Sequence, residues 1–363
     1  MVKSAAISPP SLDLTVDPPR YPRPQLDRNI RLKDILDTFP KSVFVKNPLK
    51  AWGGFFINIA LVSLGWWGIS VAPWYLLAPL WIFTGTGFFG LFIIAHDCGH
   101  RSFANRKWVN NLVGHIALIP CIYPFHPWRI QHNLHHKWTN NLDIDNTWNP
   151  FSLEKFENSP QWQQLLYRSV RGKLWWTGSI IHWAHQHFRW GQFEGKERQQ
   201  FRFSVLFVVA VIAIGAPLLI ATTGVWGLVK LWFVPWMVFH FWLSTITLFH
   251  HTLPENPFDP SDRWHEAGAQ LMGSVHCKYP WWFEFICHDI NVHVPHHVCS
   301  AIPWYNLRQA HASLEEHWGA YIVKREFSWS LIQEVTATCH LYDRDTGYFP
   351  FPRGVQGDRS HSG

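Results

Sequence analysis

Charged side chains are scarce in this sequence: 15% of its 363 residues are Asp, Glu, Lys or Arg, whereas 17% are aromatic. Between residues 51 and 95 there is no Lys, Arg, Asp, Glu or His. An uncharged stretch long enough for two helices of about 20 residues is typical of membrane-spanning segments. The 24 tryptophans and 27 phenylalanines suit a lipid interface better than a soluble domain.

Several other features are absent. The six cysteines show no paired spacing, and Cys98 and Cys299 lie in or beside histidine clusters, so we expect free thiols in a reducing compartment. No internal repeat, phosphate-binding glycine-rich loop or nucleic-acid signature occurs, which excludes nucleic acid as an expected partner. No signal sequence precedes the first apolar run near residue 51, so we expect the spans themselves to direct membrane insertion.

The apolar runs predict four transmembrane helices in two hairpins, at about residues 52–71, 74–95, 204–223 and 231–250. Pro73 marks the turn of the first hairpin, and Gly224 and Gly227 lie near the turn of the second. The sequence thus predicts an all-α integral membrane protein. We expect a membrane domain at 28–348, a disordered N-terminal tail at 1–27 and a C-terminal tail at 349–363.

Basic residues flank the predicted spans on one side. They are Arg20, Arg23, Arg28, Arg31, Lys33, Lys41, Lys46 and Lys50 before the first span, and Arg101, Arg106, Lys107, Arg129, Lys137, Arg168, Arg171 and Lys173 between the hairpins. By the positive-inside rule, both termini and the long connecting segment face the cytoplasm. The apolar segment 112–125 is too short to cross and contains two prolines, so we expect it to dip into the interface. A helical cap, including an amphipathic helix at about 314–341, is predicted on the cytoplasmic side.

Three short histidine clusters stand on that side: HDCGH at 96–100, HNLHH at 132–136 and HVPHH at 293–297. Their eight imidazoles recur at i, i+3 or i+4, which places each set on one face of a helix. The third cluster contains Pro295, so its helix must begin near that residue. Neutral imidazoles that converge in this way are typical metal ligands.

The number of histidines indicates the kind of metal centre. Four ligands fill a zinc site, so eight histidines on one face would either be surplus or serve two ions. Two ions beside apolar spans favour the oxidation of a lipid chain by O₂ at iron. Acid–base catalysis could not do this, because the C–H bond of a mid-chain methylene has no useful acidity. Four carboxylates could orient the imidazoles by accepting their second N–H: Asp97, Asp143, Asp145 and Asp289. His182, His185 and His187 are better explained by an interfacial helix face than by metal binding.

The order HDCGH, HxxHH, HVxHH, with hydrophobic hairpins between, resembles the membrane fatty-acid desaturase family. HDCGHRSFANRKWVNNLVGHIA, YPFHPWR, WWTGSIIHW and CHDINVHVPHH resemble its cyanobacterial acyl-lipid delta-12 (omega-6) branch, over about residues 28–348. The resemblance implies a histidine-ligated di-iron centre, O₂ as co-substrate, reduced ferredoxin as electron donor, and insertion of a cis double bond into mono-unsaturated acyl chains of membrane glycerolipids. The metal ligands it implies are His96, His100, His132, His135, His136, His293, His296 and His297.

The resemblance also implies one more ligand at the cytoplasmic end of the fourth span. His250 and His251 compete for that role, and His251 is favoured because it precedes Thr252, as in a QHT pattern. No HPGG haem motif occurs, so the electron donor must be a separate protein, which the basic residues Arg101, Arg106, Lys107, Arg168 and Arg171 could attract. Those residues could equally contact anionic lipid headgroups. The resemblance places the protein in a cyanobacterial plasma or thylakoid membrane.

Other functions stay open at this point. Within the superfamily, an omega-3 desaturase, or a hydroxylase or ketolase of alkanes or carotenoids, would share the metal site and differ in the substrate channel. In another class, a metal transporter would place ionisable residues along a path through the membrane. The sequence disfavours the transporter, because His240 is the one histidine deep within a predicted span.

Overall fold

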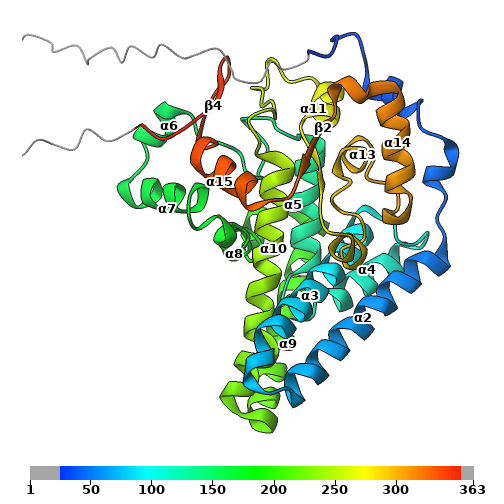
Figure 1. Ribbon diagram of the computed structural model, residues 1–363, viewed down its shortest axis with the longest axis vertical. Coiled ribbons are helices and arrows are strands. Elements are labelled where there is room, and N and C mark those ends of the chain that lie inside the picture. Colours follow the sequence, from blue (N-terminus) through cyan, green and yellow to red (C-terminus); the bar gives the residue numbers. More distant parts are fainter. Residues whose placement is uncertain (1–24, 353–363) are drawn as a thin grey trace, which may run out of the picture.

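A computed structural model describes residues 25–352, so most of both predicted tails lies outside the described residues. The chain is mostly helical (Figure 1). Its longer helices are α2 (Pro48–Val71), α3 (Leu77–His100), α4 (Lys107–Ala117), α5 (Phe125–Lys137), α7 (Gln161–Arg171), α8 (Gly178–Gln186), α9 (Gly195–Leu228), α10 (Val234–His251), α14 (Leu307–Trp318) and α15 (Trp329–Thr338). Shorter helices are α1 (Leu32–Leu36), α6 (Leu153–Glu157), α11 (Glu266–Met272), α12 (Trp281–Ile286) and α13 (His293–Val298).

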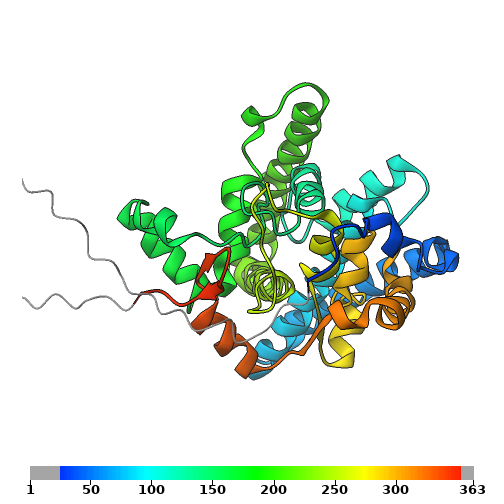
Figure 2. The same cartoon turned by 90° about the horizontal axis from the view of Figure 1, so that it is seen from above.

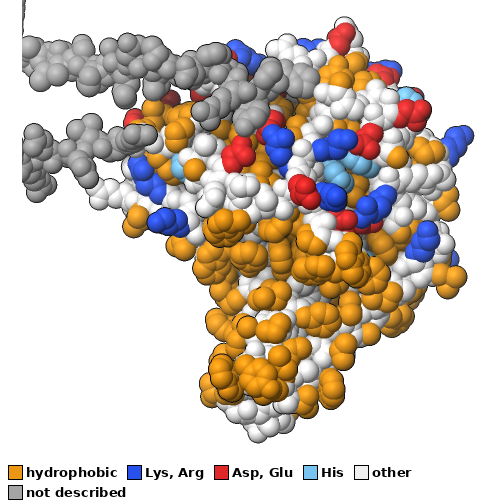
Figure 3. Space-filling model, in the orientation of Figure 1, with side chains coloured by type: hydrophobic (Ala, Val, Ile, Leu, Met, Phe, Trp, Pro, Cys, Tyr) orange, Lys and Arg blue, Asp and Glu red, His pale blue; other side chains and the backbone are white. Residues whose placement is uncertain are grey.

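Three helical stretches are long and apolar enough to cross a membrane: Pro48–Val71, Trp74–His100 and Gly195–His251. The third comprises 57 residues and contains both the third and the fourth predicted span. It is interrupted at Gly224, whose φ of 74° is easily adopted only without a side chain, and by a π-helical turn at Val229–Phe233. Apolar side chains cover the lower half of the molecule, where these helices lie, and charged side chains gather above them (Figure 3).

The segment expected to dip into the interface, residues 112–125, comprises the second half of α4 and the turn that leads to α5. α4 has 11 residues, and the chain reverses before α5 begins at Phe125. The indole N–H groups of Trp232 and Trp236 donate to the backbone oxygens of Pro120 and Cys121, each at 2.9 Å. These bonds satisfy turn carbonyls that would otherwise be buried without a partner. α4 is too short to cross a bilayer.

Two small sheets correct the expectation of an all-α fold. β1 (Val275–Lys278) pairs in parallel with β2 (Val323–Glu326), and β3 (Leu341–Asp343) pairs antiparallel with β4 (Gly347–Phe349). The helix expected at about 314–341 is therefore wrong in its middle, where β2 separates α14 from α15. The reason is that β2 alternates half-buried and exposed side chains, a period of two that fits a strand rather than a helix.

The helices above the long apolar stretches, here called the cap, lie in two parts on either side of α10. Figures 1 and 2 show α6 to α8, drawn in green, on one side and α13 and α14, drawn in orange, on the other. Aromatic side chains of α3 and α10, including Phe89, Phe92 and Phe239, form the centre of the larger hydrophobic core. This packing holds the upper ends of α3 and α10 together, which is where the histidine clusters lie.

Candidate metal centre

The first histidine cluster occupies the last turn of α3. Its helix ends at Arg101, which has a left-handed φ of 61°, and the backbone N–H of Ser102 donates to Asp97 O at 2.9 Å. His96 and His100 therefore lie one turn apart at the helix end, with ring centroids 4.7 Å apart. The spacing predicted this geometry.

α5 brings the second cluster against the first. Gly99 makes this approach possible, because a Cβ at that position would lie 2.6 Å from the Trp128 ring. Trp128 in turn stacks on His132, with centroids 4.7 Å apart and an interplanar angle of 22°. The ring of His132 thereby lies 4.8 Å from that of His96 and 4.9 Å from that of His100.

The third cluster forms α13, which begins at His293 with Pro295 inside its first turn. Proline is tolerated there because the first-turn N–H groups have no partner within the helix. His296 reaches the first cluster, with ring centroids 4.5 Å from those of His96, while His297 reaches the second, 5.1 Å from His135. All three clusters thus meet in one place.

The structure sorts the histidines into two groups, in each of which one ring nitrogen from every member lies within 4.8 Å of the others. The groups are His96, His100, His132, His136 and His296, and His135, His251 and His297. His293 joins the second, since its Nε2 lies 3.1 Å from that of His297 and 3.3 Å from that of His251. Nine histidines predicted from the sequence are brought together as two adjacent sets of nitrogens.

Hydrogen bonds fix the tautomers in the second group. His135 Nδ1–H donates to Asp145 Oδ1 at 2.8 Å, and His251 Nδ1–H donates to the backbone oxygen of Gly273 at 3.2 Å. His297 Nδ1–H points to Gln270 Oε1 at 3.3 Å. In all three histidines the proton is on Nδ1, so the free lone pair is on Nε2.

These lone pairs face one another. The Nε2 atoms of His135 and His251 are 3.2 Å apart, and in the first group those of His136 and His132 are 3.1 Å apart. The unprotonated Nε2 atoms of His135 and His251 repel at this distance unless a cation lies between them. Both ring nitrogens of His96 are also buried without a hydrogen-bond partner. The donor set therefore fits metal ions, and imidazole suits Zn, Cu, Fe or Ni.

Burial keeps five of these imidazoles neutral. It lowers the pKa of His132, His136, His293, His296 and His297 well below the usual value, and the neighbouring histidines lower it further. Neutral imidazole is the form that binds metal, so protons compete with a metal here only at low pH.

The four predicted orienting carboxylates behave differently. Asp145 is the one that closely contacts an imidazole, whereas Asp97 Oδ1 lies 3.7 Å from His96 Nδ1 and its other oxygen accepts the backbone N–H of Trp304 at 3.0 Å. Asp143 accepts from the backbone of Ser261, and Asp289 pairs with an arginine, Arg308. The last two therefore serve loop and cap structure.

Of the two histidines that end α10, His251 belongs to the second group and His250 does not. His250 instead stacks on His293, with centroids 3.9 Å apart, and its Nε2 has no hydrogen-bond partner. Successive helix residues point about 100° apart, so the His250 ring lies against the face of His293 while His251 Nε2 meets the other ring nitrogens of the group.

Sequence reasoning missed Gln270 and Thr139. The Gln270 amide nitrogen donates to the backbone oxygen of His136, which turns its Oε1 toward His297, and the Thr139 hydroxyl donates to the backbone oxygen of His135 at 3.0 Å. Thr139 lies one turn after His135, a spacing that could have indicated it. Gln270 lies in α11 with no motif around it, and no local signal points to it.

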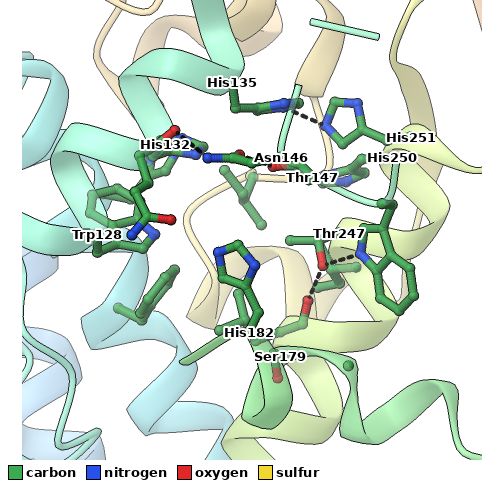
Figure 4. A pocket seen from close by; sticks show the side chains of 18 of the residues that line it. Trp128, His132, His135, Asn146, Thr147, Ser179, His182, Thr247, His250 and His251 are labelled. Carbon is green, nitrogen blue, oxygen red and sulfur yellow. Dashed lines mark hydrogen bonds between the residues drawn. The ribbon is translucent and has the colours of Figure 1, made fainter. Parts of the chain in front are cut away.

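A cavity of about 220 Å³ opens beside the two groups (Figure 4). One wall is apolar and comes from α3, α5 and α10, with Phe92, Trp128 and Leu243 among its side chains. His132, His135 and His251 line the same space. A hydrocarbon chain in this cavity would lie next to the histidine nitrogens.

Fold and site together define a helical membrane protein whose buried polyhistidine centre adjoins an apolar cavity. Residues 72–329 match the family model described as fatty acid desaturase, and the chain belongs to that family. The resemblance seen in the histidine clusters is thereby confirmed.

Relatives of this chain are similar over most of their length. An sn-1 oleoyl-lipid 12-desaturase of Picosynechococcus sp. is 55% identical over 323 residues, which cover 89% of this chain and 93% of the relative. One of Synechocystis sp. is 51% identical over 342 residues, which cover 94% of this chain and 97% of the relative. A chloroplastic omega-6 fatty acid desaturase of Brassica napus is 45% identical over 331 residues, which cover 90% of this chain and 74% of the relative.

Proposed function

We propose that this protein is an O₂-dependent acyl-lipid desaturase that inserts a cis double bond at the delta-12 (omega-6) position of mono-unsaturated acyl chains in membrane glycerolipids. The observation that carries the proposal is the convergence of nine histidines beside a cavity with an apolar wall. The cyanobacterial relatives support the choice of position, because their names specify a 12-desaturase of oleoyl lipids.

The overall reaction balances as R–CH₂–CH₂–R′ + O₂ + 2e⁻ + 2H⁺ → R–CH=CH–R′ + 2H₂O. Two iron ions at the histidine groups would supply the oxidising power that an unactivated methylene requires. The ligands that we assign to them are His96, His100, His132, His135, His136, His251, His293, His296 and His297. The chain's own residues hold these nitrogens in place, and the apolar wall holds the methylenes beside them while excluding bulk water.

We assign four spans in two hairpins, with the histidine centre on the cytoplasmic side of a cyanobacterial plasma or thylakoid membrane. The support is the bend at Gly224 within the 57-residue stretch and the separation of apolar from charged surface. The basic residues that flank the predicted spans indicate the orientation.

The electron donor that we assign is reduced ferredoxin. Of the basic residues expected to attract it, Arg101, Arg106, Lys107 and Arg168 are exposed. Arg171 is buried, and its guanidinium donates to the backbone oxygen of Trp148, so it is not available for docking and the expectation was wrong at this residue. Long-range attraction of an acidic carrier would rest on the other four.

Expression in a host that makes only saturated and mono-unsaturated acyl lipids tests the proposal. We expect dienoic chains with the new double bond at carbon 12, located by mass spectrometry, and about two irons per purified chain. His135→Ala should abolish the dienes while the protein remains in the membrane. Trienes formed only from added dienes, or oxygenated products, would replace this function with another of the superfamily. Bound zinc together with ion flux would indicate a transporter.

A further inference from the structure

The cavity has a second polar end. In Figure 4, His182 and Ser179 lie at the opposite end from His135 and His251, and the ring of His182 points into the cavity. His187 also lines the cavity, with its ring centroid 5.1 Å from that of His182. Neither His182 nor His187 belongs to the two histidine groups described above.

His187 is a buried side chain whose hydrogen bonding is incomplete. It is 1% exposed, and neither of its ring nitrogens makes a hydrogen bond of good geometry, although the backbone oxygens of Trp183 and His182 lie close enough to favour its protonated form. Burial lowers the pKa of His187 well below its usual value, so the ring is neutral and carries one N–H donor and one lone pair. Buried polar groups are nearly always satisfied, so this pattern indicates a ligand oxygen in the cavity.

The nearby Ser179 does not fill this role. The Ser179 hydroxyl donates to the backbone oxygen of His240 at 3.0 Å and accepts from the His240 ring at 2.8 Å. Ser179 is thereby used within the protein, and His187 is left to meet the ligand.

The character of the lining identifies the ligand class. No Lys, Arg, Asp or Glu is among the residues that line the cavity, so a phosphate or carboxylate would find no counter-charge. A neutral oxygen at one end and hydrocarbon along Phe92, Leu243 and Ile246 together match an amphiphile such as an esterified acyl chain.

We propose that His187, with His182 beside it, is the ester-binding subsite: its N–H donates to the carbonyl oxygen of the acyl ester while the chain extends toward the histidine centre. The inference rests on the proposed function, since it assumes an acyl-lipid substrate. His187 is then a substrate-binding residue that sets which methylenes lie beside the metal ligands.

Two phosphatidylglycerols that differ only at sn-1, an oleoyl ester and an oleyl ether, test the subsite. Binding is measured by displacement of a fluorescent acyl lipid from the iron-loaded protein in detergent, and double-bond formation is measured separately. The ester should bind about tenfold more tightly than the ether to the wild type, the effect of one buried neutral hydrogen bond. In His187→Leu this preference should fall to near one, with a mixture of double-bond positions in the product.

Two variants serve as controls. His187→Gln keeps an N–H donor and should retain the preference, even if the leucine variant does not fold. His185→Leu changes the last turn of α8, two residues before His187, but His185 is exposed and bonded to Arg189, so the preference should not change.

The outcomes separate the two proposals. Equal binding of ester and ether by the wild type, with ordered water on the His187 ring in a high-resolution structure, would overturn the subsite and leave the desaturase function intact. An ester preference that persists in His187→Leu would also overturn it. An ester preference in a wild type that forms no dienes would instead overturn the proposed function and leave the subsite standing.

Discussion

Asp145 holds His135 in one tautomer: the His135 Nδ1–H donates to Asp145 Oδ1 at 2.8 Å, and both side chains are almost completely buried. The same carboxylate accepts the backbone N–H groups of Asn140 at 2.7 Å and Thr147 at 3.0 Å. Its own orientation is therefore fixed by the chain. The result is an Nε2 lone pair on His135 that points at His251.

Asp145→Asn should weaken metal binding by about 10- to 100-fold, the range found when an outer partner of a metal-bound histidine is removed. A neutral amide stabilises the polarised imidazole less than a carboxylate does, and half of its orientations present an N–H donor to the ring. Metal content after dialysis against a graded chelator measures the effect. Asp143→Asn is the matched control, because that carboxylate accepts only from loop atoms near Ser261. Equal loss in both variants would contradict the assigned role.

His251→Ala and His250→Ala should lose unequal amounts of metal. His251 is one of the nitrogens of the second group, so its removal should release about one of two ions and abolish desaturation. His250 contributes ring stacking on His293, so its variant should keep both ions, and His250→Phe should restore most of the packing. The number of metal ions per chain in each variant, measured by mass spectrometry, shows which of the two histidines binds metal. Loss of metal from the His250 variant alone would reverse the assignment.

The parts of the site that the sequence predicted correctly are local in the chain. His96 and His100, and likewise the histidines of α5, are placed on one face by helical spacing alone, and helix ends follow from local backbone preferences. Long apolar runs similarly predict membrane helices without knowledge of their packing.

The parts that the sequence did not predict depend on contacts between distant segments. Gln270 orients His297 only because α11 packs on α13, and His187 lies in the cavity only because α8 packs on α10. β2 forms because it pairs with β1, which lies about fifty residues earlier in the chain. No periodicity within one segment encodes such partners.

The metal-free protein should lose stability as the pH falls below about 6.5, the pKa of an unperturbed histidine. Burial lowers the pKa of five imidazoles of α5 and α13 in the fold, so the unfolded chain binds protons that the folded chain cannot; the five are His132, His136, His293, His296 and His297. Each such imidazole lowers the free energy of unfolding by about 1.4 kcal/mol per pH unit until its folded pKa is reached. Thermal denaturation between pH 7.5 and 5 measures the slope.

His296→Gln removes one of these titrating groups and is the control for that slope. The variant should show a shallower decline with falling pH than the wild type, because an amide takes up no proton in either state. A wild-type melting temperature that does not change over this range would mean that the imidazoles accept protons in the folded state.

Gly99→Ala should disturb the metal centre through packing alone. Its new methyl group would lie 2.6 Å from Cζ3 of Trp128, which stacks on His132, so the α5 histidines must move away from α3. We expect a loss of about 1–3 kcal/mol in stability, as for other overpacked sites, and loss of metal from the five-histidine group. Gly53→Ala is the control, because a Cβ there meets no atom within 4 Å and helix propensity favours alanine. Thermal denaturation and metal analysis of both variants measure the difference. An unchanged metal content in Gly99→Ala would show that the contact between α3 and α5 can relax without moving the nitrogens, and that the close approach at Gly99 is not what brings the first two clusters together.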